Sequence, residues 1–105
     1  MEMQRKKMND LPFNEEKFLM HNLFREKNET VFVLNFKPGQ EMPVHKHPGN
    51  LYLLGCEGEG VFIINGVHHP CKKGYVFQIE PDEEFGAVNN SEENFSVYAV
   101  MSKRS

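Results

Sequence analysis

The sequence predicts an all-β protein folded as a jelly-roll barrel. About nine short apolar or alternating segments follow one another along 105 residues, and glycine, proline and asparagine separate them. The gaps between them leave no room for the crossover helices of ~10 residues that a parallel sheet requires. Many short strands also expose many edges, and a closed barrel is the natural way to protect them.

The expected strands follow in chain order. The first is expected around Phe18–Phe24, where a short helix over residues 14–20 is the alternative. The other eight are expected at Thr30–Phe36, Glu41–His47, Leu51–Cys56, Val61–Ile64, Val67–Cys71, Tyr75–Ile79, Phe85–Val88 and Phe95–Met101. Asn65-Gly66 lies between two of these segments, and Asn-Gly is the strongest short-range signal for a β-hairpin.

The length and the charge limit the organisation and the partners of the chain. A chain of 105 residues suits one domain, so we expect a flexible tail at residues 1–12 and a barrel domain at residues 13–105. The net charge of −3 gives little attraction for nucleic acid, whose binding depends on neutralising phosphates.

Nothing in the sequence indicates a membrane segment or a secretion signal. No apolar run approaches the ~20 residues that span a bilayer, and the charged segment Met1–Asp10 lacks the apolar stretch of a signal peptide. We therefore expect a cytoplasmic protein with no membrane partner. In that compartment Cys56 and Cys71 are expected to be reduced thiols, packed rather than bridged.

The pair His45 and His47 is the strongest chemical feature. Alternate residues of a strand share one face, so both imidazoles are expected on the same side, with Cα atoms ~7 Å apart. That spacing suits two ligands of one metal ion, while a pair of solvated histidines beside a Pro-Gly turn is the plainer interpretation. His69 is a candidate third ligand, although a core histidine bonded to backbone is the commoner explanation.

The residues around this pair resemble two motifs of the cupin family, and the likeness spans roughly residues 30–101. The positions that match the two motifs are Gly39, His45, His47 and Gly58 in the first and Gly74, Pro81 and Asn90 in the second. The chain is similar to a small single-domain cupin of the type 2 conserved barrel. This resemblance implies a cupin-type jelly-roll barrel.

The resemblance also implies a metal site, and here the chain departs from the pattern. Metal-binding cupins typically use two histidines and a carboxylate from the first motif and a histidine from the second. The carboxylate position falls on Leu51, the second-motif histidine on Gly86, and a motif glycine on Glu83. With two of four ligands substituted, a divalent transition metal (Zn, Ni, Fe or Mn) is expected to bind weakly or not at all.

The same substitutions predict an apolar pocket beside the two histidines. We expect its wall to include Leu51, Leu53 and Tyr98, with empty volume at Gly55 and Gly86. The sequence names no catalytic residue and leaves open whether the protein is an enzyme.

Three functions therefore stay open. They are a cupin that binds metal and a small molecule, a metal-free cupin that binds or senses a small molecule, and a structural dimer module. A homodimer is expected under all three, formed through sheet edges or through an exchanged N-terminal strand within Phe13–Phe24.

Overall fold

The computed structural model describes residues 3–103 as one barrel of antiparallel strands. One short 3₁₀ turn, η1, precedes nine strands. The elements are η1 (Met8–Asp10), β1 (Leu19–Arg25), β2 (Glu29–Phe36), β3 (Glu41–Lys46), β4 (Asn50–Glu57), β5 (Glu59–Ile64), β6 (Val67–Lys72), β7 (Val76–Ile79), β8 (Glu84–Val88) and β9 (Phe95–Ser102). All nine strands that the sequence predicts are present, within a few residues of their expected bounds.

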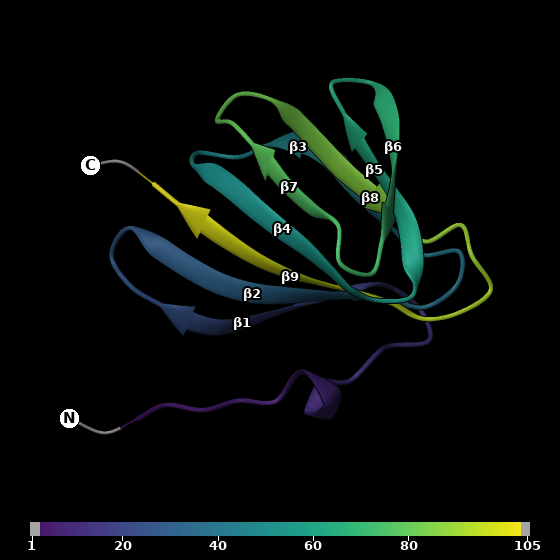
Figure 1. The fold of residues 1–105 in the computed structure, drawn as a ribbon, viewed down its shortest axis with the longest axis horizontal. Helices are drawn as coiled ribbons and strands as arrows, with labels where there is room; N and C mark the ends of the chain where they lie inside the picture. The colour runs from purple at the N-terminus through teal and green to yellow at the C-terminus, as the bar shows by residue number, and fades with distance from the viewer. Residues whose placement is uncertain (1–2, 104–105) are drawn as a thin grey trace.

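The strands form two sheets that face each other, which confirms the jelly-roll prediction. The five-stranded sheet has the order β1-β2-β9-β4-β7, and the four-stranded sheet has the order β3-β8-β5-β6 (Figure 1). Strands that are distant in sequence, such as β2 and β9, pair along their whole lengths. β1 pairs with β2 of its own chain.

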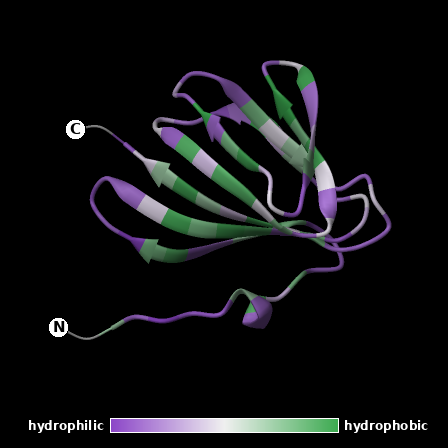
Figure 2. Cartoon of the chain, in the orientation of Figure 1, coloured by the Kyte–Doolittle hydropathy of each residue, from purple (hydrophilic) through white to green (hydrophobic). Residues whose placement is uncertain are grey.

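Alternating residues fill the space between the sheets with aromatic and aliphatic side chains. Phe36, Phe62, Phe85 and Phe95 are fully buried there, and Phe62 packs edge-on against Phe85 with ring centroids 5.2 Å apart. In Figure 2 hydrophobic colour is concentrated along the strands, while the loops and the N-terminal segment are mostly hydrophilic. Aromatic burial of this kind supplies much of the stability of a small domain.

Two local predictions have clear outcomes. Asn65 and Gly66 both have positive φ angles, 50° and 81°, as a type I′ turn requires, and they join β5 to β6. The alternative helix over residues 14–20 does not form. Instead the Asn14 side-chain oxygen accepts hydrogen bonds from the backbone amides of Glu16 and Lys17, which makes a turn before β1.

The segment expected to be a flexible tail makes specific contacts with the five-stranded sheet. The buried Asn35 amide donates to the carbonyl oxygens of Leu11 and Pro12, and a ring nitrogen of His21 lies 2.9 Å from the Pro12 oxygen. Further upstream, the Lys6 ammonium donates to the Leu23 carbonyl. These bonds hold residues 6–12 along β1 and β2, while residues 1, 2, 104 and 105 lie outside the described residues.

Both cysteines are free thiols, as expected. Cys71 is completely buried, and burial raises its pKa to about 11; the pKa of the half-buried Cys56 is raised by the same cause. Both thiols are therefore protonated near neutral pH and are poor nucleophiles. Within residues 3–103 the structure has no helix that is long and apolar enough to cross a membrane.

Candidate functional site

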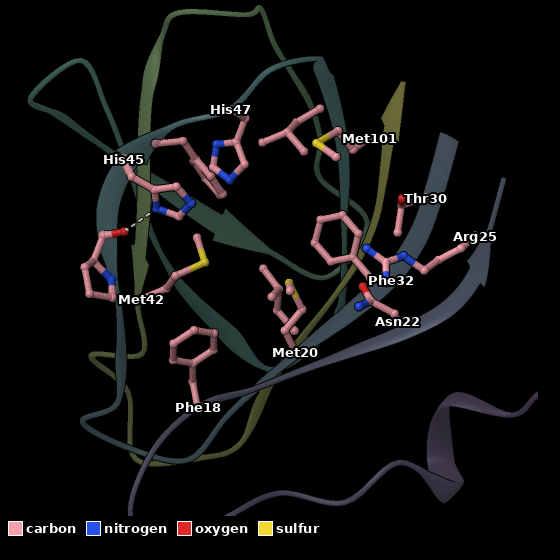
Figure 3. A pocket seen from close by; sticks show the side chains of 14 residues that line it. Phe18, Met20, Asn22, Arg25, Thr30, Phe32, Met42, His45, His47 and Met101 are labelled. Carbon is pink, nitrogen blue, oxygen red and sulfur yellow. Dashed lines mark hydrogen bonds between the residues drawn. The ribbon is translucent and has the colours of Figure 1, made fainter. Parts of the chain in front are cut away.

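A cavity of about 460 Å³ opens between β1 and β2 on one side and β3 and β8 on the other (Figure 3). Nine of its fourteen lining residues are apolar, and they come from both sheets. They are Phe18, Met20, Phe32, Leu34, Met42, Pro43, Leu51, Phe85 and Met101. The polar lining residues are Asn22, Arg25, Thr30, His45 and His47.

His45 and His47 lie together on the wall of this cavity, which confirms that they share a face. Their ring centroids are 4.2 Å apart, and the two planes are tilted by 39°. His45 is exposed, and its Nδ1 lies 3.0 Å from the Pro43 carbonyl oxygen, which accepts a hydrogen bond from this nitrogen when it carries the proton. A bulge between Met42 and His45 places both of these side chains on the cavity side of β3.

His47 is the more buried of the two histidines. Its Nδ1 atom is buried and has no hydrogen-bond partner among the residues that the structure describes. Burial, and secondly the neighbouring charge of His45, lower the pKa of His47 below 6.5. His47 is therefore neutral at pH 7.

Leu51 and Phe85 are two of the nine apolar residues that line the cavity with the histidines. Leu51, which stands at the carboxylate position of the first motif, lines the cavity. Phe85 pairs with His45 across β3 and β8, and its ring centroid is 5.9 Å from that of His47. Assigning the missing second-motif histidine to Gly86 was therefore wrong, because Phe85 is the β8 residue beside the pair.

Two other positions of the second motif also lie one residue earlier in the chain than the sequence assignment placed them. The residue with positive φ in the loop before β8 is Asp82, at 73°, rather than Glu83. The buried asparagine that ties the following loop is Asn89, whose amide donates to Phe36 and Glu93 carbonyls, rather than Asn90. A positive φ angle and a buried side-chain amide that bonds to backbone carbonyls are each needed at one particular position of the loop. They therefore locate the motif more reliably than the identity of its residues does.

Four residues predicted to line the pocket lie elsewhere. Leu53 is fully buried in the core, and Tyr98 alternates with the core residues Val97 and Ala99, so it faces outward from β9. The prediction of empty volume at the two glycines was wrong. A Cβ at Gly55 would collide with the Lys72 carbonyl, and one at Gly86 would lie 2.7 Å from the Val44 side chain.

The donor set does not fit a typical cupin metal centre. His69 lies on β6, at the opposite edge of the four-stranded sheet from β3, and it does not line the cavity. Within residues 3–103 no group of three or more His, Cys, Asp or Glu side chains is placed to hold a metal ion. Two imidazoles beside Leu51 and Phe85 offer neither a third ligand nor a carboxylate to balance the metal charge.

No sequence signal indicated the polar group at the other end of the cavity. Arg25 and Thr30 are direct cross-strand partners on β1 and β2, so their side chains share the cavity face, and Asn22 lies nearby on β1. Figure 3 shows these three side chains gathered on the side away from His45. Only the strand register brings them together.

Comparison with known families places the chain among the cupins. The family model described as a cupin domain matches residues 32–101. That match covers most of the chain, so the chain belongs to the cupin family. It confirms the resemblance carried by the two histidine and glycine motifs.

Individual relatives agree with this placement. A dimethylsulfoniopropionate lyase, DddW, from Ruegeria pomeroyi is 35% identical over 60 residues, which cover 57% of this chain and 40% of that protein. The match thus spans less than half the length of the curated relative.

Two solved structures have the same fold over nearly the whole chain. An uncharacterised protein with a double-stranded β-helix domain from Klebsiella pneumoniae has a TM-score of 0.89 at 23% identity, covering 96% of this chain and 90% of that one. TT1209 from Thermus thermophilus also has a TM-score of 0.89, at 22% identity, covering 98% of this chain and 100% of that one. At this identity they show the fold alone.

Proposed function

We propose that the protein binds a small, largely apolar molecule in the cavity beside His45 and His47. The observation that carries this proposal is the cavity itself, with about 460 Å³ of space and nine apolar residues among fourteen. Small-molecule sites typically have 300–1,000 Å³ and mostly apolar walls with a few placed polar groups. Both properties hold here.

The chemistry of the walls indicates how such a molecule is held. Removing its apolar surface from water contributes roughly 25 cal/mol per Å², which favours binding without specific bonds. Direction comes from the few polar residues of the lining, among them His45 and His47.

Metal binding at the two histidines is the competing interpretation, and the donor set argues against it for the reasons given above. The relative DddW is named as a lyase of a small molecule, which agrees with a ligand cavity in this fold. The reaction is not carried over, because one fold supports many activities.

The proposal is tested with octan-1-ol, a neutral probe with an apolar body. We expect octan-1-ol to raise the melting temperature of the wild-type protein, because a ligand that binds only the folded state stabilises it. Met101→Trp fills the cavity and should abolish this shift. Val100→Trp adds the same ring on the opposite face of β9 and should retain it.

Three results would contradict the proposal. The first is the absence of a melting shift with octan-1-ol in the wild-type protein. The second is an equal shift in the Met101→Trp variant. The third is stoichiometric binding of Zn²⁺ or Ni²⁺ that is lost in the His45→Ala, His47→Ala double variant and occurs without any binding of octan-1-ol.

A further inference from the structure

The cavity has a second polar end, distinct from the histidines. Arg25 on β1 pairs with Thr30 on β2, Thr30 pairs with Met101 on β9, and Met101 pairs with Leu51 on β4. All four residues line the cavity. They form one row across the sheet, which begins at a cation and ends at an apolar residue.

The charge of this row is unbalanced. Arg25 is the only permanently charged residue among the fourteen that line the cavity, and no Asp or Glu is among them. Within residues 3–103, Arg25 is not part of any salt bridge. A cation that lacks a carboxylate partner at the edge of an apolar cavity favours an anionic group on the ligand.

We propose that the natural ligand is a monocarboxylate with an apolar body, held by Arg25 at its charged end. This proposal rests on the proposed function, because it names the class of molecule that occupies the same cavity. The planar guanidinium can donate two parallel hydrogen bonds to one carboxylate. The Thr30 hydroxyl, directly opposite Arg25, and the Asn22 amide are further donors on the same face.

The length of the row sets the shape of the ligand. Three strand spacings of ~4.8 Å separate β1 from β4, so the row is roughly 14 Å long between its outer Cα atoms. The carboxylate lies at Arg25, and the apolar chain passes Met101 towards Leu51 and Phe85. One cation balances one negative charge, which favours a monocarboxylate over a phosphate monoester of charge near −2.

The test compares three probes with the same chain and different head groups. Octanoate, octan-1-ol and octylammonium are titrated into wild-type protein and into Arg25→Met, Arg25→Lys and Lys27→Met variants by calorimetry. Lys27 is an exposed residue in the β1–β2 turn that does not line the cavity, so Lys27→Met removes the same charge as a matched control.

We expect octanoate to bind the wild-type protein more tightly than octan-1-ol does, and octylammonium to bind most weakly. Arg25→Met should weaken octanoate binding about tenfold, the effect of losing a charge-assisted bond, and should change octan-1-ol binding much less. Arg25→Lys should give an intermediate affinity, because it keeps the charge and loses the planar fork. Lys27→Met should match the wild-type protein.

The outcomes separate this inference from the proposed function. Equal octanoate affinity in the wild-type protein and Arg25→Met overturns the carboxylate assignment, and continued binding of octan-1-ol then leaves the apolar cavity standing. If Lys27→Met weakens octanoate binding as much as Arg25→Met does, the carboxylate assignment is also overturned, since the effect would then come from the net charge of the protein. If none of the three probes binds, both proposals fail.

Discussion

The two ends of the cavity come from different sheets and differ in burial. At one end, His47 and Phe85 lie between β3 and β8, where Phe85 is 1% exposed and packs against Phe62. At the other end, Arg25 and Thr30 lie on β1 and β2 near the outer edge of the five-stranded sheet, and Arg25 is exposed. At the first end Phe85 belongs to the core, whereas Arg25 at the second end does not.

This difference separates residues that maintain the fold from residues that select a ligand. A substitution at the histidine end changes packing, so its effect on binding is mixed with its effect on stability. A substitution at Arg25 removes a charge from a solvated position and leaves the core intact.

Phe85→Ala should lower the free energy of unfolding by about 3–5 kcal/mol, because it leaves a cavity in the core. Arg25→Ala, at the other end, should change it by no more than about 0.5 kcal/mol, as is usual for exposed positions. Urea unfolding of both variants measures the two values. Similar losses in both variants would show that the two ends do not differ as described.

Leu51→Glu combined with Phe85→His should turn the histidine end into a metal site. The double variant offers three imidazoles and a carboxylate around one point of the cavity. We expect its affinity for Zn²⁺ or Ni²⁺ to exceed that of the wild-type protein by on the order of a hundredfold, since two further ligands complete the set. Calorimetry in a weakly chelating buffer measures the change.

A matched control keeps this result specific. Tyr52→Glu combined with Phe85→His adds the same groups, but Tyr52 faces outward from β4, next to Leu51. This control should bind metal far more weakly than the first double variant. High metal affinity in the wild-type protein itself would contradict the conclusion that two histidines form an incomplete set.

His47 should make the stability of the protein depend on pH. Its pKa is lowered in the folded state, by burial first and by His45 second. As the pH falls below the unfolded value of 6.5, the unfolded chain binds a proton at this residue more readily than the folded protein does. Stability is therefore retained above 6.5 and lost as the pH falls towards the lower folded pKa.

The measurement compares melting temperatures at pH 7.5 and 5.5. Between pH 7.5 and 5.5 the melting temperature of His47→Gln should fall less than that of the wild-type protein. The melting temperature of His68→Gln, a substitution on the exposed face of β6, should fall as much as that of the wild-type protein. If His47→Gln follows the wild-type curve, the burial of His47 does not contribute to the pH dependence.

Most of the fold could be predicted from local sequence signals. Strand residues alternate and turns use Gly, Pro and Asn, so all nine strands and the Asn65-Gly66 hairpin are visible in the sequence. The contacts of residues 6–12 were not visible, because they depend on one buried side chain, Asn35, that bonds to two distant carbonyl groups. Nothing near Leu11 indicates that partner.

The candidate site was predictable only at its histidine end. His47 comes directly after the last residue of β3 and two residues after His45, so a period of two was enough to place them together. The sequence assignment chose Gly86 instead of its neighbour Phe85. The pairing of β8 with β3 decides which β8 residue faces the cavity, and the motif pattern does not show this pairing. Arg25 and Thr30 flank an ordinary polar turn between β1 and β2. Only the register of β2 with β1 and with β9 shows that both residues face the cavity.

The orientation of a bound carboxylate tests the central claim most directly. Nuclear Overhauser contacts between octanoate and methyl-labelled protein report which end of the ligand lies where. We predict contacts from the methylene next to the carboxylate to the Thr30 methyl group, and from the terminal methyl group to Leu51. The reversed orientation, with the terminal methyl group at Thr30 and the carboxylate end at Leu51, would contradict the account.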